Sequence, residues 1–199
     1  MWRISNLSVP LDYTPEELKR IAAKRLKTQF HNITSIHIVK RSVDARKKTN
    51  VHFVLTLDVA LKRPVMGTLP PGVTAPVKKP EIQLPSRTFT HRPVVVGSGP
   101  AGLFCGLLLA KAGANPILLE RGSPVEERAK DVDTFWKTGK LNLSSNVQFG
   151  EGGAGTFSDG KLNTGTKDPR IEKVLREMVW AGAPESILWD CLLYTSRCV

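Results

Sequence analysis

The sequence predicts an α/β protein of two modules, in which a small basic α+β domain precedes the first part of a domain with buried parallel strands. Three observations carry this prediction. Apolar and polar residues alternate within residues 1–62 around one amphipathic helix. Short apolar strands flanking a helix follow from residue 92. Residues 1–92 contain 17 Lys and Arg against 6 Asp and Glu, whereas residues 93–199 contain 12 of each, so we expect a domain boundary near residue 90.

The N-terminal domain, residues 1–62, has a β-α-β-β pattern. Residues 14–17 (Thr-Pro-Glu-Glu) form a capping box with proline at the first helical position, which marks the start of the helix. Alternating apolar residues predict strands at residues 36–38 and 51–59, joined by a polar, mostly basic hairpin connection at residues 40–50. The apolar face of the helix consists of Leu18, Ile21, Ala22 and Leu26. This order of elements predicts a ferredoxin-like α+β domain.

A linker is expected at residues 63–91. Six of the 14 prolines lie in residues 61–92, which have little apolar periodicity. Such a composition is typical of an extended connection without a core of its own.

The next domain, residues 92–190, begins with a strand, a helix and a second strand. Residues 94–96 (Val-Val-Val) and 117–119 (Ile-Leu-Leu) are predicted as strands buried on both faces, and residues 100–112 as the helix between them. Two further helices are predicted to begin at Ser123-Pro124-Val125-Glu126 and at Asp168-Pro169.

The turn between the first strand and the helix contains G-x-G-x-x-G at Gly97, Gly99 and Gly102, and Glu120 ends the second strand. Gly97 allows the tight turn, Gly99 lets a pyrophosphate approach the backbone, and Gly102 allows the helix to pack on the strand. The helix N-terminus favours phosphate, and a carboxylate at Glu120 can accept hydrogen bonds from both ribose hydroxyls of an adenosine. This context predicts a Rossmann-type dinucleotide-binding domain. The alternative is a glycine-rich turn in an unrelated α/β domain.

NAD and FAD share the ADP half, so the three glycines do not distinguish between them. Pro100-Ala101 within the turn and Glu120-Arg121-Gly122 at the end of the second strand favour FAD.

A second glycine-rich segment, FGEGGAGTFSDGKL at residues 149–162, has no helical or strand periodicity. Composition alone is compatible with a linker. Placed after the dinucleotide motif, the segment is predicted to form a second wall of the cofactor site, where bare backbone approaches the ligand.

The two glycine segments together resemble those of glutathione-reductase-type flavoproteins. RPVVVGSGPAGLF (92–104), LERGSPVEERAKDVDTFWKTGKLN (119–142), SNVQFGEGGAGTFSDGKL (145–162) and KRSVDARKK (40–48) resemble more closely the bacterial FAD-dependent, or NAD(FAD)-utilising, dehydrogenases. This resemblance implies a cytoplasmic FAD-dependent oxidoreductase in which a small domain precedes the FAD domain. It also implies a chain longer than this one, so that the Rossmann-type FAD-binding domain is truncated here and the fragment retains FAD weakly and is inactive.

The resemblance also implies which residues hold the cofactor. The first glycine turn would bind the FAD pyrophosphate, Glu120 the adenosine ribose, and the two arginines and the second segment the phosphates or the ribityl chain. The complete set is Gly97, Ser98, Gly99, Pro100, Ala101, Gly102, Glu120, Arg121, Arg128, Gly152, Gly153, Ala154, Gly155, Thr156, Ser158 and Lys161.

The same sequence is compatible with two other functions, NAD(P) binding without flavin and RNA binding by the N-terminal domain. An NAD(P)-binding enzyme without flavin remains possible, as does NAD(P)H as electron donor to the flavin. The basic N-terminal domain, with Arg41, Arg46, Lys47 and Lys48 on its hairpin, offers RNA phosphates a surface. Because stacking aromatics are few, we favour docking of this domain onto the flavin domain, with Ser42, Asp44 and Arg46 as polar interface groups.

No catalytic residue and no metal site are predicted, and the small-molecule substrate is not identified. The four histidines lie before residue 92 without ligand-like spacing, and no closely spaced cysteine pair suggests a disulfide reductase. Asp159 and Lys161 are near enough in the sequence to face a flavin, but they can equally hold the shape of the loop. The longest apolar run is too short for a membrane span. Because the first residues have no apolar core behind a charged leader, we expect no secretory signal.

The last nine residues, CLLYTSRCV at 191–199, match the translation of a transposon end joined to its inverted copy. We expect them to be a sequencing-adapter tail and the natural reading frame to continue beyond Asp190, the alternative being a natural amphipathic end. With that tail set aside, Cys105 is the remaining cysteine and is expected to be a small core residue.

Overall fold

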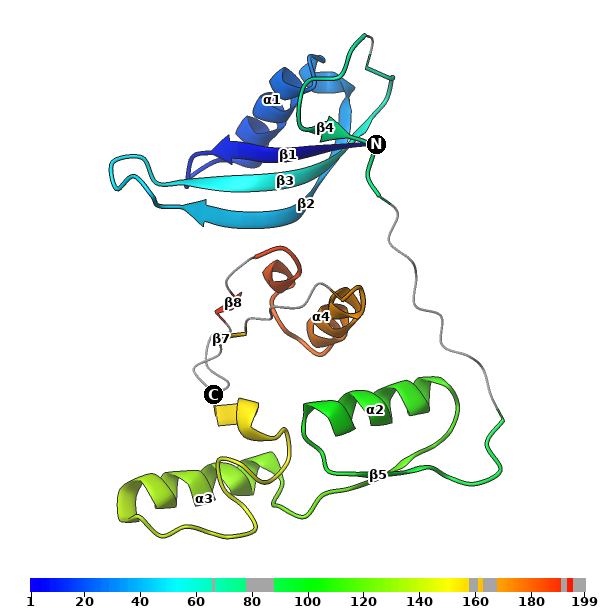
Figure 1. Ribbon diagram of the computed structural model, residues 1–199, viewed down its shortest axis with the longest axis vertical. Coiled ribbons are helices and arrows are strands. Elements are labelled where there is room, and N and C mark those ends of the chain that lie inside the picture. Colours follow the sequence, from blue (N-terminus) through cyan, green and yellow to red (C-terminus); the bar gives the residue numbers. More distant parts are fainter. Residues whose placement is uncertain (66, 78–87, 158–160, 163–167, 191–192, 195–199) are drawn as a thin grey trace. The chain divides into compact units, whose positions relative to one another are not determined.

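The computed structural model describes residues 1–65, 67–77, 88–157, 161–162, 168–190 and 193–194 (Figure 1). The chain divides into two compact units. The first comprises Met1–Pro80 and Asn163–Leu193, and the second Glu81–Leu162 and Tyr194–Val199. The helix after Asp168, which the sequence assigns to the second domain, therefore groups with the N-terminal unit.

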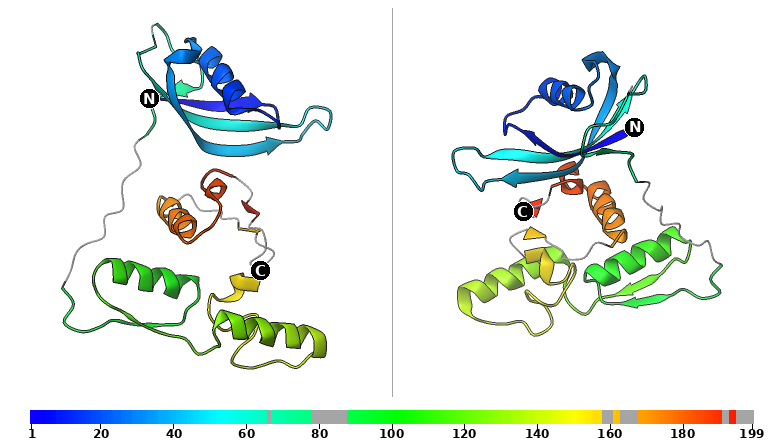
Figure 2. Two further views of the ribbon diagram at one scale, coloured as in Figure 1. Left: turned by 180° about the vertical axis from the view of Figure 1, so that it is seen from behind. Right: turned by 45° about the horizontal axis from the view of Figure 1, so that its top comes forward.

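The first unit is built on a four-stranded antiparallel sheet in the order β2-β3-β1-β4, with a helix on one face (Figures 1 and 2). The expected β-α-β-β order is confirmed, and a fourth strand is added to it. The elements are β1 (Trp2–Val9), α1 (Pro15–Arg25), η1 (Phe30–Asn32), β2 (Ile33–Asp44), β3 (His52–Leu61) and β4 (Val73–Thr74).

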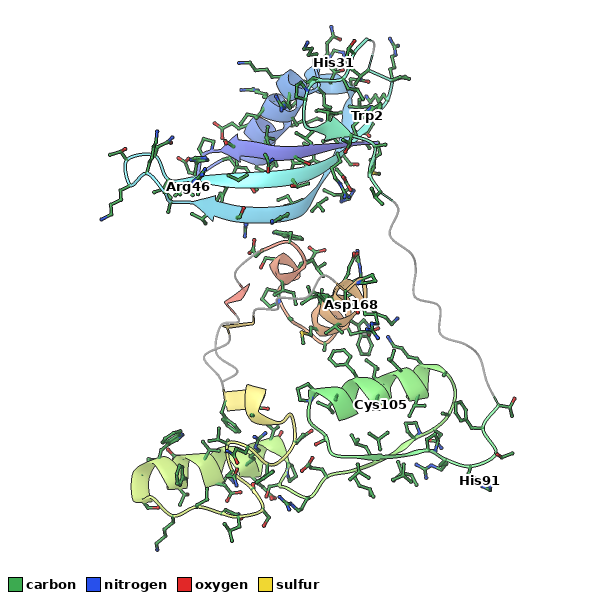
Figure 3. All side chains as sticks on the ribbon, viewed as in Figure 1. Trp2, His31, Arg46, His91, Cys105 and Asp168 are labelled. Carbon is green, nitrogen blue, oxygen red and sulfur yellow. The ribbon has the colours of Figure 1, made fainter. Side chains whose placement is uncertain are left out.

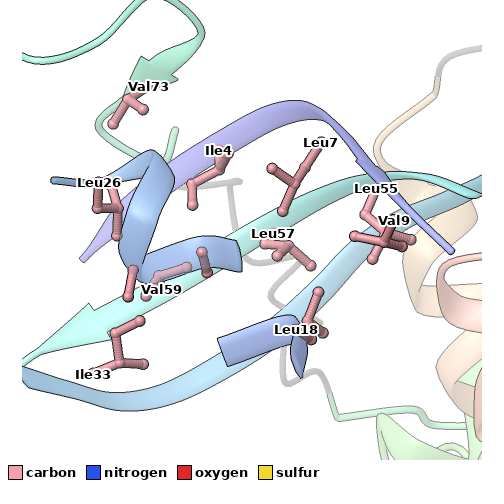
Figure 4. Packing of buried hydrophobic residues seen from close by; sticks show 12 residues of the cluster. Ile4, Leu7, Val9, Leu18, Leu26, Ile33, Leu55, Leu57, Val59 and Val73 are labelled. Carbon is pink, nitrogen blue, oxygen red and sulfur yellow. The ribbon is translucent and has the colours of Figure 1, made fainter. Parts of the chain in front are cut away.

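The core of this unit lies between α1 and the sheet (Figure 4). Leu55, Leu57 and Val59 alternate along β3 and are fully buried, as their period-two spacing predicts. Burial of one such side chain contributes about 1.5–3 kcal/mol. The cluster consists of Ile4, Leu7, Val9, Leu18, Ala22, Ala23, Leu26, Ile33, Leu55, Leu57, Val59 and Val73.

The start of α1 confirms the capping box. The Thr14 hydroxyl accepts a hydrogen bond from the Glu17 N–H at 3.2 Å, and the Glu17 carboxylate accepts one from the Thr14 N–H at 2.8 Å. The Thr14 N–H and the Thr14 hydroxyl both donate to the Glu17 carboxylate and lower the pKa of Glu17 from its ordinary value. The reciprocal contacts satisfy two backbone donors and fix the first turn of the helix.

Strand β2 is longer than the sequence predicts, because it continues to Asp44 through residues expected to be part of the hairpin connection. Arg41, Ser42 and Val43 pair with Leu55, Val54 and Phe53 of β3. Polar side chains are compatible with this strand where its outer face reaches solvent. The turn that remains carries Arg46 (Figure 3), whose guanidinium pairs with Asp44. This pair and the N–H of Arg46 lower the pKa of Asp44 to about 2.

Part of the stretch expected to be a linker belongs to the sheet. Strand β4 pairs with β1, and Val73 is buried in the core. Gly72 has φ +77°, and its carbonyl accepts a hydrogen bond from the Ser5 N–H at 2.9 Å. The turn at Gly72 therefore brings one apolar residue to the sheet edge, although a two-residue strand has no periodicity to reveal it.

A segment comprising α4 (Arg170–Trp180), η3 (Glu185–Leu188) and the two residues that follow also lies in the first unit. The Arg41 N–H donates to the Trp189 carbonyl at 2.7 Å, and the Arg41 guanidinium makes a bidentate ion pair with Asp190 at 2.6 and 2.8 Å. These contacts attach the segment to the outer edge of β2.

The second unit contains a parallel strand pair, β5 (Val94–Val96) and β6 (Ile117–Leu119), joined by α2 (Pro100–Lys111). The strand-helix-strand order and the parallel pairing agree with the sequence prediction. The unit also contains α3 (Val125–Thr138), η2 (Ala154–Phe157) and β7 (Lys161–Leu162). Near the end of the chain, β8 (Leu193–Tyr194) has one residue in each unit.

The expectation that these strands are buried on both faces is wrong for this chain. Val95 is buried and faces α2, but Val94, Val96 and Leu119 are 55%, 82% and 51% exposed. Cys105 on α2 (Figure 3) is likewise exposed rather than part of the core. The physical reason is that the pair of strands and its helix form a layer whose outer surfaces no other described element of the unit covers.

Candidate functional site

The first glycine turn connects β5 to α2. Gly97 has φ +95°, a conformation that favours glycine, and its N–H donates to the Leu119 carbonyl at 2.7 Å. A Cβ on Gly102 would lie 1.8 Å from the Gly97 carbonyl oxygen, so a side chain there would clash with the backbone. A Cβ on Gly99 would have no heavy atom within 4 Å. The turn is therefore closed at Gly102 and open at Gly99.

Gly99 is the N-cap residue of α2, and Pro100 occupies the first helical position. Gly99 has no side chain to cap the helix, and the first N–H groups of a helix lack partners within the helix. Those groups and the helix dipole make this end of α2 suitable for an anion. Pro100 and Ala101 are exposed beside it.

Glu120 follows β6 and contacts the glycine turn. Its carboxylate accepts hydrogen bonds from the Ser98 N–H at 2.7 Å, the Ser98 hydroxyl at 2.9 Å and the Gly122 N–H at 2.8 Å. The backbone donors of Gly122 and Ser98 lower the pKa of Glu120 to about 2. Glu120 is therefore an anion at neutral pH. Its side chain is exposed, so the lone pairs that these donors do not use face solvent.

The second glycine segment packs against the first. The Gly152 N–H donates to the Ser98 carbonyl at 2.9 Å, and a Cβ on Gly153 would lie 3.0 Å from Pro100 Cδ and 3.2 Å from Gly99 Cα. Gly152 and Gly153 have φ +83° and +69°, which favours glycine at both positions. The two segments, some 50 residues apart in the sequence, therefore meet backbone to backbone beside the N-terminus of α2.

The rest of the second segment is partly described. Ala154 and Gly155 are exposed in η2, and a Cβ on Gly155 would meet no atom within 4 Å. The Thr156 hydroxyl lies 3.5 Å from the Glu151 carbonyl. Ser158, Asp159 and the side chain of Lys161, which the sequence analysis singled out, lie outside the described residues.

The two candidate arginines lie in different surroundings. Arg121 is exposed, and its guanidinium carbon lies 4.7 Å from the centre of the Phe149 ring. Arg128 is fully buried, and its guanidinium donates to backbone carbonyls of the loop that precedes Gly152. Of the two, Arg121 is the one that reaches solvent.

Glu151 and Asn146 were not singled out from the sequence, although both organise the second segment. The Glu151 carboxylate accepts from the Val125 N–H at 2.8 Å and so caps α3. Ser123 was expected in that role, but the N-cap residue is Pro124 without a side-chain cap. The Asn146 side-chain oxygen accepts from two backbone N–H groups of the loop, those of Gln148 and Phe149.

Other kinds of site find little support. Among the described residues, no group of three or more His, Cys, Asp and Glu side chains is arranged to hold a metal ion. None of the helices within the described part of the chain is long and apolar enough to span a membrane. The His52 ring lies beside the Asn50 carbonyl at 3.0 Å, in the hairpin of the first unit.

Comparison with known proteins gives three similarities. Residues 91–132 match a family described as an FAD binding domain. Residues 1–60 match a family described as a domain of unknown function, DUF8436. An uncharacterized protein of Clostridium beijerinckii (strain ATCC 51743 / NCIMB 8052) is 44% identical over 194 residues.

That alignment covers 94% of this chain and 36% of the relative, so the chain spans just over a third of the relative's length. The FAD binding similarity includes the first glycine turn, Glu120 and the start of α3. The similarities therefore indicate a flavin-binding type of domain in the region of the first glycine turn.

Proposed function

We propose that this chain is the N-terminal part of an FAD-dependent oxidoreductase and that its second unit holds the ADP half of FAD. The observation that carries the proposal is the meeting of the two glycine segments at Ser98 and Gly152, beside the N-terminus of α2 and the carboxylate of Glu120. The match of residues 91–132 to an FAD binding domain supports the same cofactor. Members of that family are typically flavin-dependent oxidoreductases or monooxygenases.

The shape of the glycine turn fits a dinucleotide. Backbone is crowded at Gly102, where helix and strand approach each other, and free at Gly99 and Gly155, where a side chain would point into open space. This is the distribution expected if the pyrophosphate lies against Gly99 and the helix must pack closely three residues later. The strand-helix-strand order supports a Rossmann-type fold for this unit, and we propose the glutathione-reductase type from the resemblance of the glycine segments.

Each residue then has a role. The N-terminal N–H groups and dipole of α2 bind the pyrophosphate. Glu120 accepts the ribose hydroxyls with its remaining lone pairs, and its negative charge disfavours a 2′-phosphate. Arg121 is placed to contact a phosphate or ribityl oxygen. The second segment forms the opposite wall through Gly152, Gly153, Ala154, Gly155 and Thr156. Ser158 and Lys161, which lie outside the described residues, stay candidates for binding the cofactor by resemblance alone.

The flavin supplies the redox chemistry by accepting or donating a hydride, and the protein orients it. NAD(P)H is the electron donor that we propose. The sheet order β2-β3-β1-β4 with α1 on one face supports a ferredoxin-like assignment for the N-terminal unit, for which we propose docking rather than nucleic-acid binding.

An NAD(P)-binding enzyme without flavin is the nearest alternative, because the same turn and acid serve NAD. The visible spectrum of the purified full-length relative from Clostridium beijerinckii separates the two. We expect a yellow protein with flavin absorption, or one that acquires it on addition of FAD. A colourless protein that takes up no FAD would contradict the proposal.

A further inference from the structure

Arg128 lies in the first turn of α3 and has no exposed surface. Burying a guanidinium costs several kcal/mol unless its donors find partners. Here each nitrogen donates to a backbone carbonyl. Nε donates to Asn146 at 2.8 Å, Nη2 to Val147 at 2.8 Å, and Nη1 to Gly150 at 3.4 Å and to Glu151. Each nitrogen of this side chain therefore reaches the loop of residues 146–151, and Nη1 also donates to the Thr156 hydroxyl at 3.4 Å.

The contact with Glu151 reaches the glycine turn through a single peptide group. The carbonyl of Glu151 and the N–H of Gly152 belong to the same planar, trans peptide and point in opposite directions. Arg128 binds the oxygen of that peptide, and the Ser98 carbonyl accepts from its N–H at 2.9 Å. The peptide plane is thus held from both sides, by α3 and by the β5–α2 turn.

The neighbouring glycines leave the space that this arrangement needs. A Cβ on Gly150 would lie 2.6 Å from Arg128 Cδ, and Gly150 has φ +124°. A Cβ on Gly122 would lie 2.4 Å from Gly150 Cα. The loop can therefore close over the guanidinium only where these two residues lack side chains.

The buried guanidinium of Arg128 keeps its charge although its surroundings oppose it. Burial lowers the pKa of Arg128, and the charge of Glu120 acts in the opposite direction. A guanidinium remains protonated throughout the physiological range. The centre of the Phe157 ring lies 4.9 Å from the guanidinium carbon, so this ring also covers the guanidinium.

We propose that Arg128 is a positioning residue of the cofactor site, which holds the second glycine segment against the first without itself contacting the cofactor. The part of this inference that concerns FAD rests on the proposed function, whereas the part that concerns the loop does not. The residue acts through the Glu151–Gly152 peptide, whose orientation decides where Gly152 and Gly153 lie relative to Gly99.

The test uses the 199-residue chain and three variants: Arg128→Met, Arg128→Lys and, as a control, Lys130→Met at an exposed position of the same helix. Hydrogen exchange of the Gly152 amide is measured by NMR without ligand. Affinity for FAD is then measured by NMR titration, at a temperature where circular dichroism shows every variant folded.

We expect exchange at Gly152 to be at least tenfold faster in Arg128→Met and Arg128→Lys, and FAD affinity to fall at least tenfold in both. Lysine keeps the charge but cannot bridge the carbonyls, and it carries the test if the methionine variant does not fold. A Gly152 amide that exchanges at the wild-type rate in Arg128→Lys, whether or not the FAD affinity is also unchanged, would overturn the inference. Absence of FAD binding by the wild type would instead count against the proposed function, and Gly152 exchange would still decide the role of Arg128.

Discussion

The N–H of Gly152 donates to the carbonyl of Ser98 at 2.9 Å, and this bond joins two glycine segments that are distant in the sequence. Ser98 is buried and also donates to Glu120 through its N–H and hydroxyl. One residue of the first turn therefore contacts both the acid that we assign to the ribose and the segment that we propose to lie opposite the pyrophosphate.

Substituting Gly152 tests the geometry of this contact. Gly152 has φ +83°, and an added Cβ would lie 2.2 Å from the Thr156 hydroxyl oxygen. Gly152→Ala should destabilise the second unit by about 1–2 kcal/mol, because an L-residue resists the left-handed conformation. Urea unfolding followed by NMR signals of α2 measures this. Gly155→Ala, where no atom lies within 4 Å, is the control and should change stability by less than about 0.5 kcal/mol. Equal effects of the two substitutions would show that the contact does not depend on the conformation of Gly152.

The carboxylate of Glu120 gives the turn a pH dependence. Hydrogen bonds from Gly122 and Ser98 lower its pKa from 4.5 to about 2 in the folded chain. Because the folded value lies below the unfolded one, the contribution of Glu120 is fully present above pH 4.5 and is lost as the pH falls towards 2. As the pH falls from 4.5 towards 2, we expect the amide of Ser98 to exchange faster relative to its intrinsic rate.

Glu120→Gln should remove that pH dependence, and the Ser98 amide should exchange at the faster rate at every pH. The side chain of glutamine has one acceptor oxygen, so it cannot accept from Ser98 and Gly122 through two oxygens as the carboxylate does. Glu126→Gln, at an exposed position of α3, serves as the control. A Ser98 amide with the same pH profile in wild type and Glu120→Gln would count against the assignment.

The core of the N-terminal unit should unfold independently of the second unit when it is weakened. Leu57 is fully buried on β3, where it pairs with Ile4 and Ile38. Leu57→Ala should cost about 2–5 kcal/mol through lost burial and a cavity. Hydrogen exchange should then accelerate in β1 to β3 but stay unchanged in α2. Val43→Thr, at a position 54% exposed on β2, should cost less than about 0.5 kcal/mol. Acceleration throughout the chain would show that the two units are not independent.

The ion pair between Arg41 and Asp190 should hold the segment of α4 and η3 on the edge of β2. Asp190 raises the pKa of Arg41, and both side chains are partly buried. Asp190→Asn should weaken attachment by about 1 kcal/mol and speed exchange of the Arg41 amide, which donates to Trp189. Asp133→Asn, in the exposed pair with Lys137, should have an effect below about 0.5 kcal/mol. An Arg41 amide that exchanges at the wild-type rate in Asp190→Asn would show that the pair does not hold the segment.

Sequence patterns predicted the elements that depend on local signals. The capping box at Thr14, the alternation along β3 and the spacing of Gly97, Gly99 and Gly102 each depend on residues close together in the chain. Strand β4 was not foreseen, because one buried valine in a proline-rich stretch has no period.

The contacts of Arg128 were not foreseen for a different reason. Its partners are backbone carbonyls about 20 residues away, and every residue type has such a carbonyl. The glycines around it were visible, but only the fold shows that Gly150 and Gly122 make room for one side chain. The exposure of Val96 also depends on what covers the sheet rather than on its own sequence.

If the turn at Gly99 and the segment at Gly152 form two walls of one FAD site, as we propose, both should respond when FAD binds. The most direct test is an NMR titration of the 199-residue chain with FAD, because it detects even weak binding. We expect saturable shifts at residues 97–102, 120–122 and 150–156. Gly99→Val should weaken this binding at least tenfold, because it fills the space open at Gly99, whereas Gly106→Ala on α2 should leave it unchanged. No shifts in these residues up to the solubility limit of FAD, or equal affinity of the Gly99→Val variant, would contradict the claim.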